Sequence, residues 1–180
     1  MAIIDANNYF SGVGTSGYSP TAQTDNIFPY TIDTAPLGLP TGSGGAATTG
    51  YNSGSAVNAG RDLGVGTEFW LEVLVTAAVT SAGAPTVTFY LGTDAAATLA
   101  SFSSSTGVGV LLTSPTFLKA ALPISTVAWR TQLPASLSYL EFIGVVCTIG
   151  TTTLTGGTFE AKLLPNIQQS DLYLSGIAVQ

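Results

Sequence analysis

The sequence predicts an all-β protein. Its composition is rich in Gly, Ala, Ser and Thr and only 8% charged, whereas helix faces in water are usually built from long charged side chains. Its apolar residues also alternate in short segments, and clusters of turn residues separate these segments. Short strands with no helical period between them are typical of a β-sandwich, a barrel or a jelly roll.

The most apolar stretch runs from Tyr139 to Leu164 and predicts two strands joined by a polar turn over 150–157. From Leu140 to Ile149 both alternating sets are apolar, so this strand is expected in the middle of the fold. Residues 158–164 alternate as a strand with one wet face does. We therefore expect a β-hairpin here. The inward residues of its second strand are Phe159, Ala161 and Leu163, and the outward ones are Thr158, Glu160 and Lys162.

Alternating apolar residues also predict strands earlier in the chain. The segment 67–76 places Phe69, Leu71, Val73 and Val75 on one face, and the turn Ser81 to Pro85 leads into a strand over 86–91. This pattern predicts a second hairpin. Weaker strands are expected at 108–113 and 127–133, because Pro115 and Pro123 interrupt this region. A last strand is expected at 172–179.

The N-terminal third has a different character. Ser11 to Ala56 is rich in Gly, Ser, Thr and Pro, which predicts little regular structure. Aromatic residues spaced along its first half indicate that this half lies against something. Ile3 and Ile4 fit a short strand or an anchoring arm. The predicted organisation is a single domain over 1–180, with an extended arm over 1–56 and a sandwich core over 57–180.

Charge excludes several classes of function. Four basic and ten acidic residues give a net charge of −6, which argues against nucleic acid and anionic membranes as partners. No apolar run reaches the length of a membrane span. The first ten residues lack the features of a signal peptide, so synthesis in the cytoplasm without export is expected.

The sequence offers little for catalysis. It contains no histidine, and its one thiol, Cys147, is expected to be buried. Glu68 and Glu72 share a strand face but stand roughly 13 Å apart along it, too far for a hydrolase pair, so a solvated face is expected. No enzyme activity, cofactor or metal is predicted. The aspartates in loop-like contexts, Asp5, Asp25, Asp33, Asp62, Asp94 and Asp171, fit turn caps better than calcium ligands.

Outward aromatic residues are the candidates for a binding surface. Trp70 and Tyr90 face outward by parity, whereas Trp129 is expected in the core. Half-buried packing, subunit contact and ligand stacking all remain open for the first two. With Leu74 they form a plausible patch for self-association. The predicted assembly residues are Trp70, Leu74, Tyr90, Tyr9, Phe10, Phe28 and Tyr30.

Several segments together resemble a known family. They are Met1 to Asp5, VNAGRDLG at 57–64, EFWLEVLVTA at 68–77, Leu133 and Pro134 before YLEFIGVV, TLTGGTFEAKLL, and the closing LYLSGIAVQ. In order and spacing they resemble the jelly-roll capsid cement (decoration) proteins of tailed bacteriophages, of the Bordetella phage type. The chain departs from that pattern at Ser138, where the family often has a basic residue, and in the length of the segment before Val57.

The resemblance implies a jelly roll and a non-enzymatic virion protein on the capsid exterior. Such a protein binds the major capsid protein as a homotrimer around local threefold positions and clamps adjacent capsomers. The main alternative is a carbohydrate-binding β-sandwich or adhesion module, with Trp70 and Tyr90 as stacking residues. A carboxylate hydrolase is a further alternative, for which the sequence offers no plausible pair.

Overall fold

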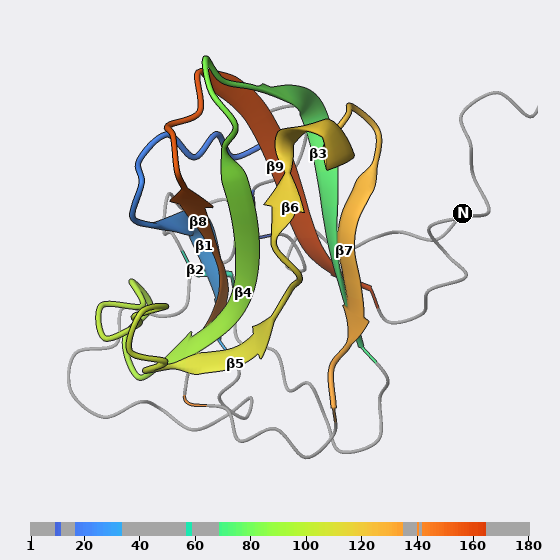
Figure 1. The fold of residues 1–180 in the computed structure, drawn as a ribbon. Coiled ribbons are helices and arrows are strands. Elements are labelled where there is room, and N and C mark those ends of the chain that lie inside the picture. The colour runs from blue at the N-terminus through green and yellow to red at the C-terminus, as the bar shows by residue number, and fades with distance from the viewer. Residues whose placement is uncertain are drawn as a thin grey trace, which may run out of the picture.

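The computed structural model describes residues 10–11, 17–33, 57–58, 69–134, 140 and 142–164, and these form two facing β-sheets (Figure 1). One sheet has the order β2-β1-β8-β4-β5, with β6 beside β4, and the other has the order β7-β3-β9. All pairings are antiparallel except that of β1 with β2. The predicted antiparallel β-sandwich is confirmed. The elements are β1 (Asp25–Asp33), β2 (Val57–Asn58), β3 (Trp70–Thr80), β4 (Thr86–Asp94), β5 (Val110–Thr113), β6 (Phe117–Leu118), the 3₁₀ turn η3 (Lys119–Ala121), β7 (Val127–Gln132), β8 (Phe142–Gly150) and β9 (Gly156–Leu164).

The sandwich is built from long segments of the chain, here called arms, each of which contributes strands to both sheets. The arm 70–94 crosses from β3 in one sheet to β4 in the other, and the arm 142–164 crosses from β8 to β9 beside it. Their register stays antiparallel on both sides of the bend, with Thr80 opposite Gly156 and Thr86 opposite Gly150. A paired ribbon that rolls over in this way is the construction principle of a jelly roll.

Two further arms flank this ribbon. Residues 110–132 run antiparallel to the arm 70–94. In the larger sheet β5 and β6 pair with β4, and in the smaller sheet β7 pairs with β3. On the other side β1 pairs with β8, and a single bridge joins Tyr18 to Phe159 of β9. Phe10 continues this contact, since its N–H donates to the carbonyl of Ala161 at 2.8 Å. Four neighbouring arms therefore follow the same bend from sheet to sheet.

Neither predicted hairpin forms. The strands β3 and β4 lie in different sheets, and so do β8 and β9. Their turns connect the sheets and bond to each other, because Ser81 Oγ donates to the carbonyl of Thr153 and Thr151 Oγ1 donates to that of Ala84, both at 2.7 Å. Each strand carries an unbroken apolar face, and these faces are buried when they oppose each other across the core. Turn chemistry alone does not distinguish the two arrangements.

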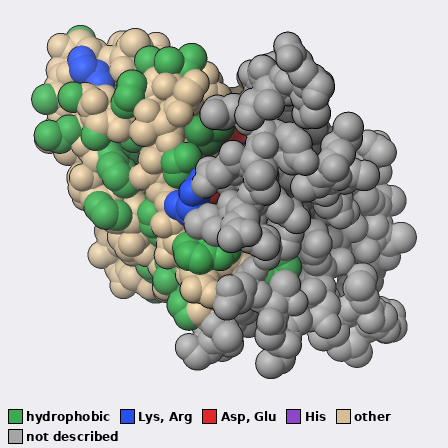
Figure 2. Space-filling model, turned by 90° about the vertical axis from the view of Figure 1, so that its right-hand side faces the viewer, with side chains coloured by type: hydrophobic (Ala, Val, Ile, Leu, Met, Phe, Trp, Pro, Cys, Tyr) green, Lys and Arg blue, Asp and Glu red, His purple; other side chains and the backbone are tan. Residues whose placement is uncertain are grey.

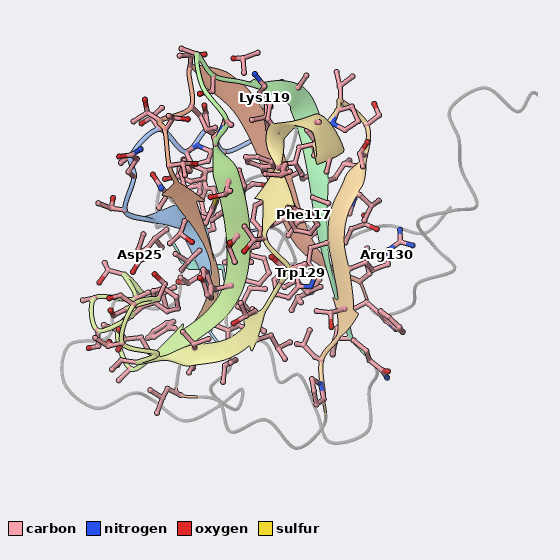
Figure 3. All side chains as sticks on the ribbon, viewed as in Figure 1. Asp25, Phe117, Lys119, Trp129 and Arg130 are labelled. Carbon is pink, nitrogen blue, oxygen red and sulfur yellow. The ribbon has the colours of Figure 1, made fainter. Side chains whose placement is uncertain are left out.

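The core between the sheets confirms the predicted inward residues. The fully buried side chains of β3, β4, β8 and β9 meet there, and the rings of Phe89 and Phe159 pack edge to face at 5.1 Å. Trp129 is buried as predicted and points between the sheets with Phe117, whereas Arg130 points away (Figure 3). The central place predicted for the first strand of 139–164 is confirmed, since β8 lies between β1 and β4.

The N-terminal third contains regular structure that the sequence did not predict. Strand β1 lies within Ser11 to Ala56, where little was expected. The aromatic residues there do lie against the fold, because Phe28 is buried and its ring stands 4.8 Å from that of Tyr18. Several predicted features lie outside the described residues. They are the segments 12–16 and 34–56, Ile3 and Ile4, and the strand expected at 172–179.

A loop covers part of the outer face of the larger sheet. Residues 95–109 join β4 to β5 and press Leu99 and Phe102 onto Val146 of β8, forming a second, smaller apolar cluster. Two glycines make room for them. A Cβ at Gly144 would stand 2.7 Å from Leu99 Cδ1, and one at Gly92 would stand 2.7 Å from Phe102 Cδ2. Val146 is therefore covered on the outer side of β8, as predicted, whereas Leu140, a member of the same apolar set, is 52% exposed.

Candidate functional site

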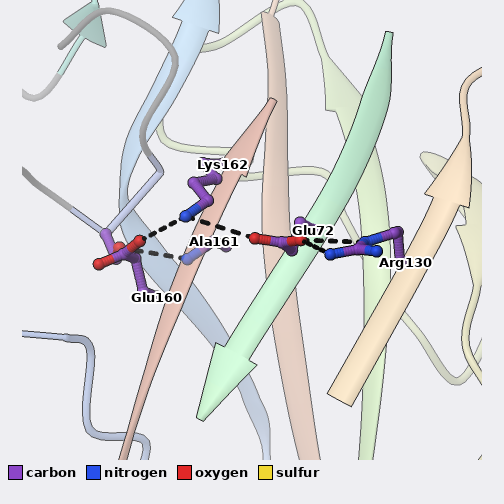
Figure 4. Close-up of polar contacts among 6 residues, drawn as sticks. Glu72, Arg130, Glu160, Ala161 and Lys162 are labelled. Atoms are coloured by element: carbon purple, nitrogen blue, oxygen red, sulfur yellow. Dashed lines mark hydrogen bonds and ion pairs between the residues drawn. The ribbon is translucent and has the colours of Figure 1, made fainter. Parts of the chain in front are cut away.

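Charged side chains form a row across the outer face of the three-stranded sheet (Figure 4). Glu72 of β3 stands opposite Arg130 of β7 and Lys162 of β9. Arg130 Nε donates to Glu72 Oε2 at 2.9 Å, and its Nη2 donates to the same oxygen. Lys162 Nζ lies 3.3 Å from Glu72 Oε1 and donates to Glu160 Oε1 at 3.1 Å. We call these four residues the ion-pair row.

The ion-pair row corrects the prediction of a solvated face. Glu72 is only 3% exposed, although its outward parity was predicted correctly. A carboxylate that is removed from water must be compensated by opposite charge and hydrogen bonds. Both of its oxygens have cationic partners, so the row holds the three strands in register. Glu68, the other member of the considered carboxylate pair, lies outside the described residues.

Two aspartates hold the loop 95–109 in place by accepting hydrogen bonds from it. Asp94 accepts hydrogen bonds from the N–H groups of Ser101 at 2.6 Å and Ala96 at 3.2 Å. These bonds, that of Ser101 first, hold the pKa of the Asp94 carboxyl below its ordinary value. Asp25 of β1 accepts from the N–H of Ser104 at 3.0 Å and from its hydroxyl. Asp94 thus caps the turn that follows it, as predicted, whereas Asp25 binds a loop that is distant in sequence.

The remaining candidates for chemistry are also part of the fold. Cys147 is buried, as predicted, and burial raises the pKa of its thiol. No group of three or more His, Cys, Asp and Glu side chains suited to a metal ion occurs among the described residues. Within the same residues no helix is long and apolar enough to cross a membrane.

The proposed aromatic patch does not exist as one surface. Trp70 and Leu74 are half-buried on the outer face of the three-stranded sheet, on either side of Glu72. Tyr90 belongs to β4 in the other sheet, where its ring packs 6.0 Å from that of Phe102. The two sheets face each other, so their outer faces look in opposite directions. Parity identified the outward residues correctly but could not assign them to a sheet.

The N-terminal aromatic residues of the predicted assembly set likewise do not form one exposed surface among the described residues. Phe10 and Phe28 are buried in the core, at 0% and 2% exposure, so they stabilise the sandwich and offer no surface for assembly. Tyr30 is half-buried on β1, and its N–H donates to the carbonyl of Phe10 at 3.0 Å. Tyr9 lies outside the described residues.

Exposed apolar side chains that the sequence analysis did not identify lie on the arm 110–132. Leu118 and Ile124 are 60% and 59% exposed, and Val127 is exposed as well. We call these three residues the edge strip, because β6 and β7 each lie at an edge of the described sheets. Figure 2 views the molecule from the β7 side and shows hydrophobic side chains with few charged ones between them on its described part. The sequence signal is an apolar segment that lacks strand alternation between Pro115 and Val127.

Comparison with known proteins adds one decisive match. The family model Bbp16 matches residues 44–163. The chain belongs to the Bbp16 family. The name of this family indicates a Bordetella phage protein, so the bacteriophage association that the resemblance implied is confirmed at this level. No curated protein matches the chain.

The Bbp16 match spans most of the described fold. Its range runs from before β2 to the penultimate residue of β9 and therefore includes the ion-pair row, the loop 95–109 and the edge strip. Strand β1 precedes the matched range. The ion-pair row, the loop 95–109 and the edge strip thus belong to the part of the chain that matches the Bbp16 family.

Proposed function

We propose that this Bbp16-family chain is a structural virion protein without enzymatic activity. It binds the outer surface of an assembled phage capsid and cements adjacent capsomers through the major capsid protein. In this proposal it acts as a homotrimer. Family membership supports the association with a phage, and the use of the polar residues within the fold supports a structural role.

The observation that carries the proposal is that polar groups suited to chemistry are engaged in holding the fold. Glu72 is enclosed by two cations. Asp94 and Asp25 bind backbone N–H groups of one loop. Cys147 of β8 is buried in the core between the sheets. These bonds join strands and a loop to one another, which suits a clamp between capsomers, since a clamp must transmit load without opening.

A protein that makes the same contact several times can bind a capsid firmly even when each single contact is weak. A trimer at a local threefold position can touch several capsomers at once, and linked contacts increase the overall affinity far beyond that of each single contact. The carbohydrate-binding alternative receives less support. Its two stacking residues, Trp70 and Tyr90, lie on different sheets, so they cannot form one platform for a sugar.

The experiment compares capsids that lack this protein with capsids to which the purified chain has been added back. The proposal predicts that added protein raises the temperature at which capsids release their DNA. An equal amount of heat-unfolded protein serves as the control. Unchanged release temperatures at saturating protein would contradict the proposed cementing function.

A further inference from the structure

Two short pieces of the N-terminal segment cover the outer edge of β9. Among the described strands, β9 lies at the edge of the smaller sheet. The N–H of Tyr18 donates to the carbonyl of Phe159 at 2.8 Å, and the N–H of Phe159 donates back to the carbonyl of Tyr18 at 2.9 Å. The carbonyl of Ala161 accepts from the N–H of Phe10 at 2.8 Å, and the N–H of Ala161 donates to Ser11 Oγ at 3.2 Å. We call these pieces, residues 10–11 and 17–18, the strap.

The strap fits this position closely. Phe10 is fully buried in the core, and its carbonyl also accepts a hydrogen bond from the N–H of Tyr30 on β1. Gly17 lies so near the sheet that an added Cβ would stand 2.5 Å from Thr76 Oγ1 and 2.9 Å from the carbonyl oxygen of Phe159. The strap therefore occupies the place of a further strand beside β9. Without it, β9 would present unpaired backbone groups, and such an edge is a template for pairing with another chain.

The part of β9 beneath the strap is complementary to itself. Phe159 and Ala161 direct their backbone groups away from β3, and Glu160 and Lys162 carry the charges of the outer face (Figure 4). When two copies of β9 pair antiparallel about Ala161, Glu160 of each copy stands opposite Lys162 of the other. These charged pairs fall at positions that are not hydrogen-bonded between the two strands, where facing side chains are closest.

The same register also matches the apolar residues. It places Phe159 of each copy opposite Leu163 of the other, on the inner face that the strap covers in the single copy. A register centred on Glu160 would instead bring two carboxylates face to face, which is unfavourable. Charge and apolar pattern therefore favour one partner for this edge, namely β9 of a second copy.

We propose that the strap is an autoinhibitory contact that keeps β9 from pairing with β9 of a second copy. The apparent affinity of a masked site is reduced by the fraction of time for which the site is open. Any change that loosens the strap should therefore increase self-association through β9. This inference goes beyond the proposed function, because it concerns an association that the strap prevents and its test needs no capsids.

The test uses the full chain and measures its average mass by light scattering over a range of concentrations. Phe10→Ser removes the buried ring, and Gly17→Val creates a collision with Thr76 and Phe159 while every core side chain is kept. Each change should raise the association constant at least about tenfold above that of the wild type, because the edge is open for more of the time. Circular dichroism verifies folding, and Gly17→Val serves alone if Phe10→Ser does not fold.

Two further variants test specificity. Phe102→Ser is the matched control and should keep the wild-type mass, since Phe102 is 8% exposed but packs on the outer side of the larger sheet. Glu160→Lys, added to Gly17→Val, places like charges opposite each other in the paired strands and should return the mass to that of the wild type. A gain in mass that persists in this double variant overturns the inference, because the association then uses another surface.

Hydrogen exchange shows directly whether the edge is open. In the Gly17→Val variant, at concentrations too low for association, the amides of Phe159 and Ala161 should exchange faster than in the wild type, because their acceptors belong to the strap. Faster exchange with no gain in mass at any concentration overturns the inference, since an open edge would then attract no second copy. Unchanged exchange and unchanged mass overturn it as well, because the strap would then not control this edge.

Discussion

Arg130 and Glu72 form a charged pair across β7 and β3 in which two guanidinium nitrogens donate to one carboxylate oxygen. Lys162 approaches the other oxygen from β9, so one acid links all three strands of the smaller sheet. In a protein with so few charged residues, this placement indicates that charge is used for register more than for solubility. A cross-strand pair that is satisfied in only one register disfavours strand slippage.

Removal of Glu72 should therefore be costly. We expect Glu72→Ala to lower the free energy of unfolding by about 3 kcal/mol, because two cations lose their buried partner. Glu160→Ala is the matched control, since it removes the outer acid of the same row, and it should cost less than about 1 kcal/mol. Urea denaturation followed by circular dichroism measures both. Equal losses for the two variants would contradict this account of the row.

Contact between the loop 95–109 and the sheet predicts a coupled pair of substitutions. Gly144→Ala should destabilise the protein by about 2 kcal/mol, because the new methyl group would collide with Leu99. Leu99→Ala should cost about 3 kcal/mol through the cavity that it leaves. In the double variant the methyl group enters that cavity, so the combined loss should be smaller than the sum. Additive losses in urea denaturation would show that the loop does not press on Gly144.

Asp94 gives a pH-dependent prediction. Its pKa is lower in the folded protein than its ordinary value of about 3.9. The unfolded chain therefore binds a proton more readily, and the contribution of Asp94 to stability is complete above about pH 5 and lost as the pH falls through the folded pKa. The difference in unfolding free energy between the wild type and Asp94→Asn should be constant from pH 5 to 7 and shrink below about pH 4. A difference that stays constant down to pH 3 would refute this role.

Cys147 reports whether the sandwich opens. Its thiol is buried and its pKa is raised, so the reactive thiolate is scarce in the folded state. Thiol reagents at pH 8 should label the unfolded chain quickly and the native chain only as fast as the core opens. Mass spectrometry after timed quenching measures this rate. Native labelling as rapid as that in urea would place Cys147 on an accessible surface, contrary to the structure.

Local patterns predicted much of the fold but not the strand pairing. The alternation around β3, β4, β8 and β9 identified the inward residues because a strand places successive side chains on opposite faces. The same alternation fits a hairpin or a connection between sheets, so both predicted hairpins were wrong. Strand β1 was missed because Pro29 and polar neighbours interrupt its pattern, and its register does shift between Ile27 and Thr31.

The candidate surfaces were harder to predict than the core. Glu72 was placed on the correct face, but its burial depends on Arg130 and Lys162, which lie 58 and 90 positions away in sequence. Such contacts follow from the sheet order, which a single sequence does not reveal. The separation of Trp70 from Tyr90 has the same origin. The edge strip has no strand alternation, so a search for alternating residues could not detect it.

We propose above all that the chain binds the exterior of an assembled capsid. The most direct test is saturation binding of the purified protein to intact capsids that lack it, measured by co-sedimentation and counted per major capsid protein. If the binding sites lie on the outer surface, the ratio at saturation should be fixed and should stay the same when the capsids are full of DNA. No co-sedimentation, or binding only to disrupted shells, would contradict it.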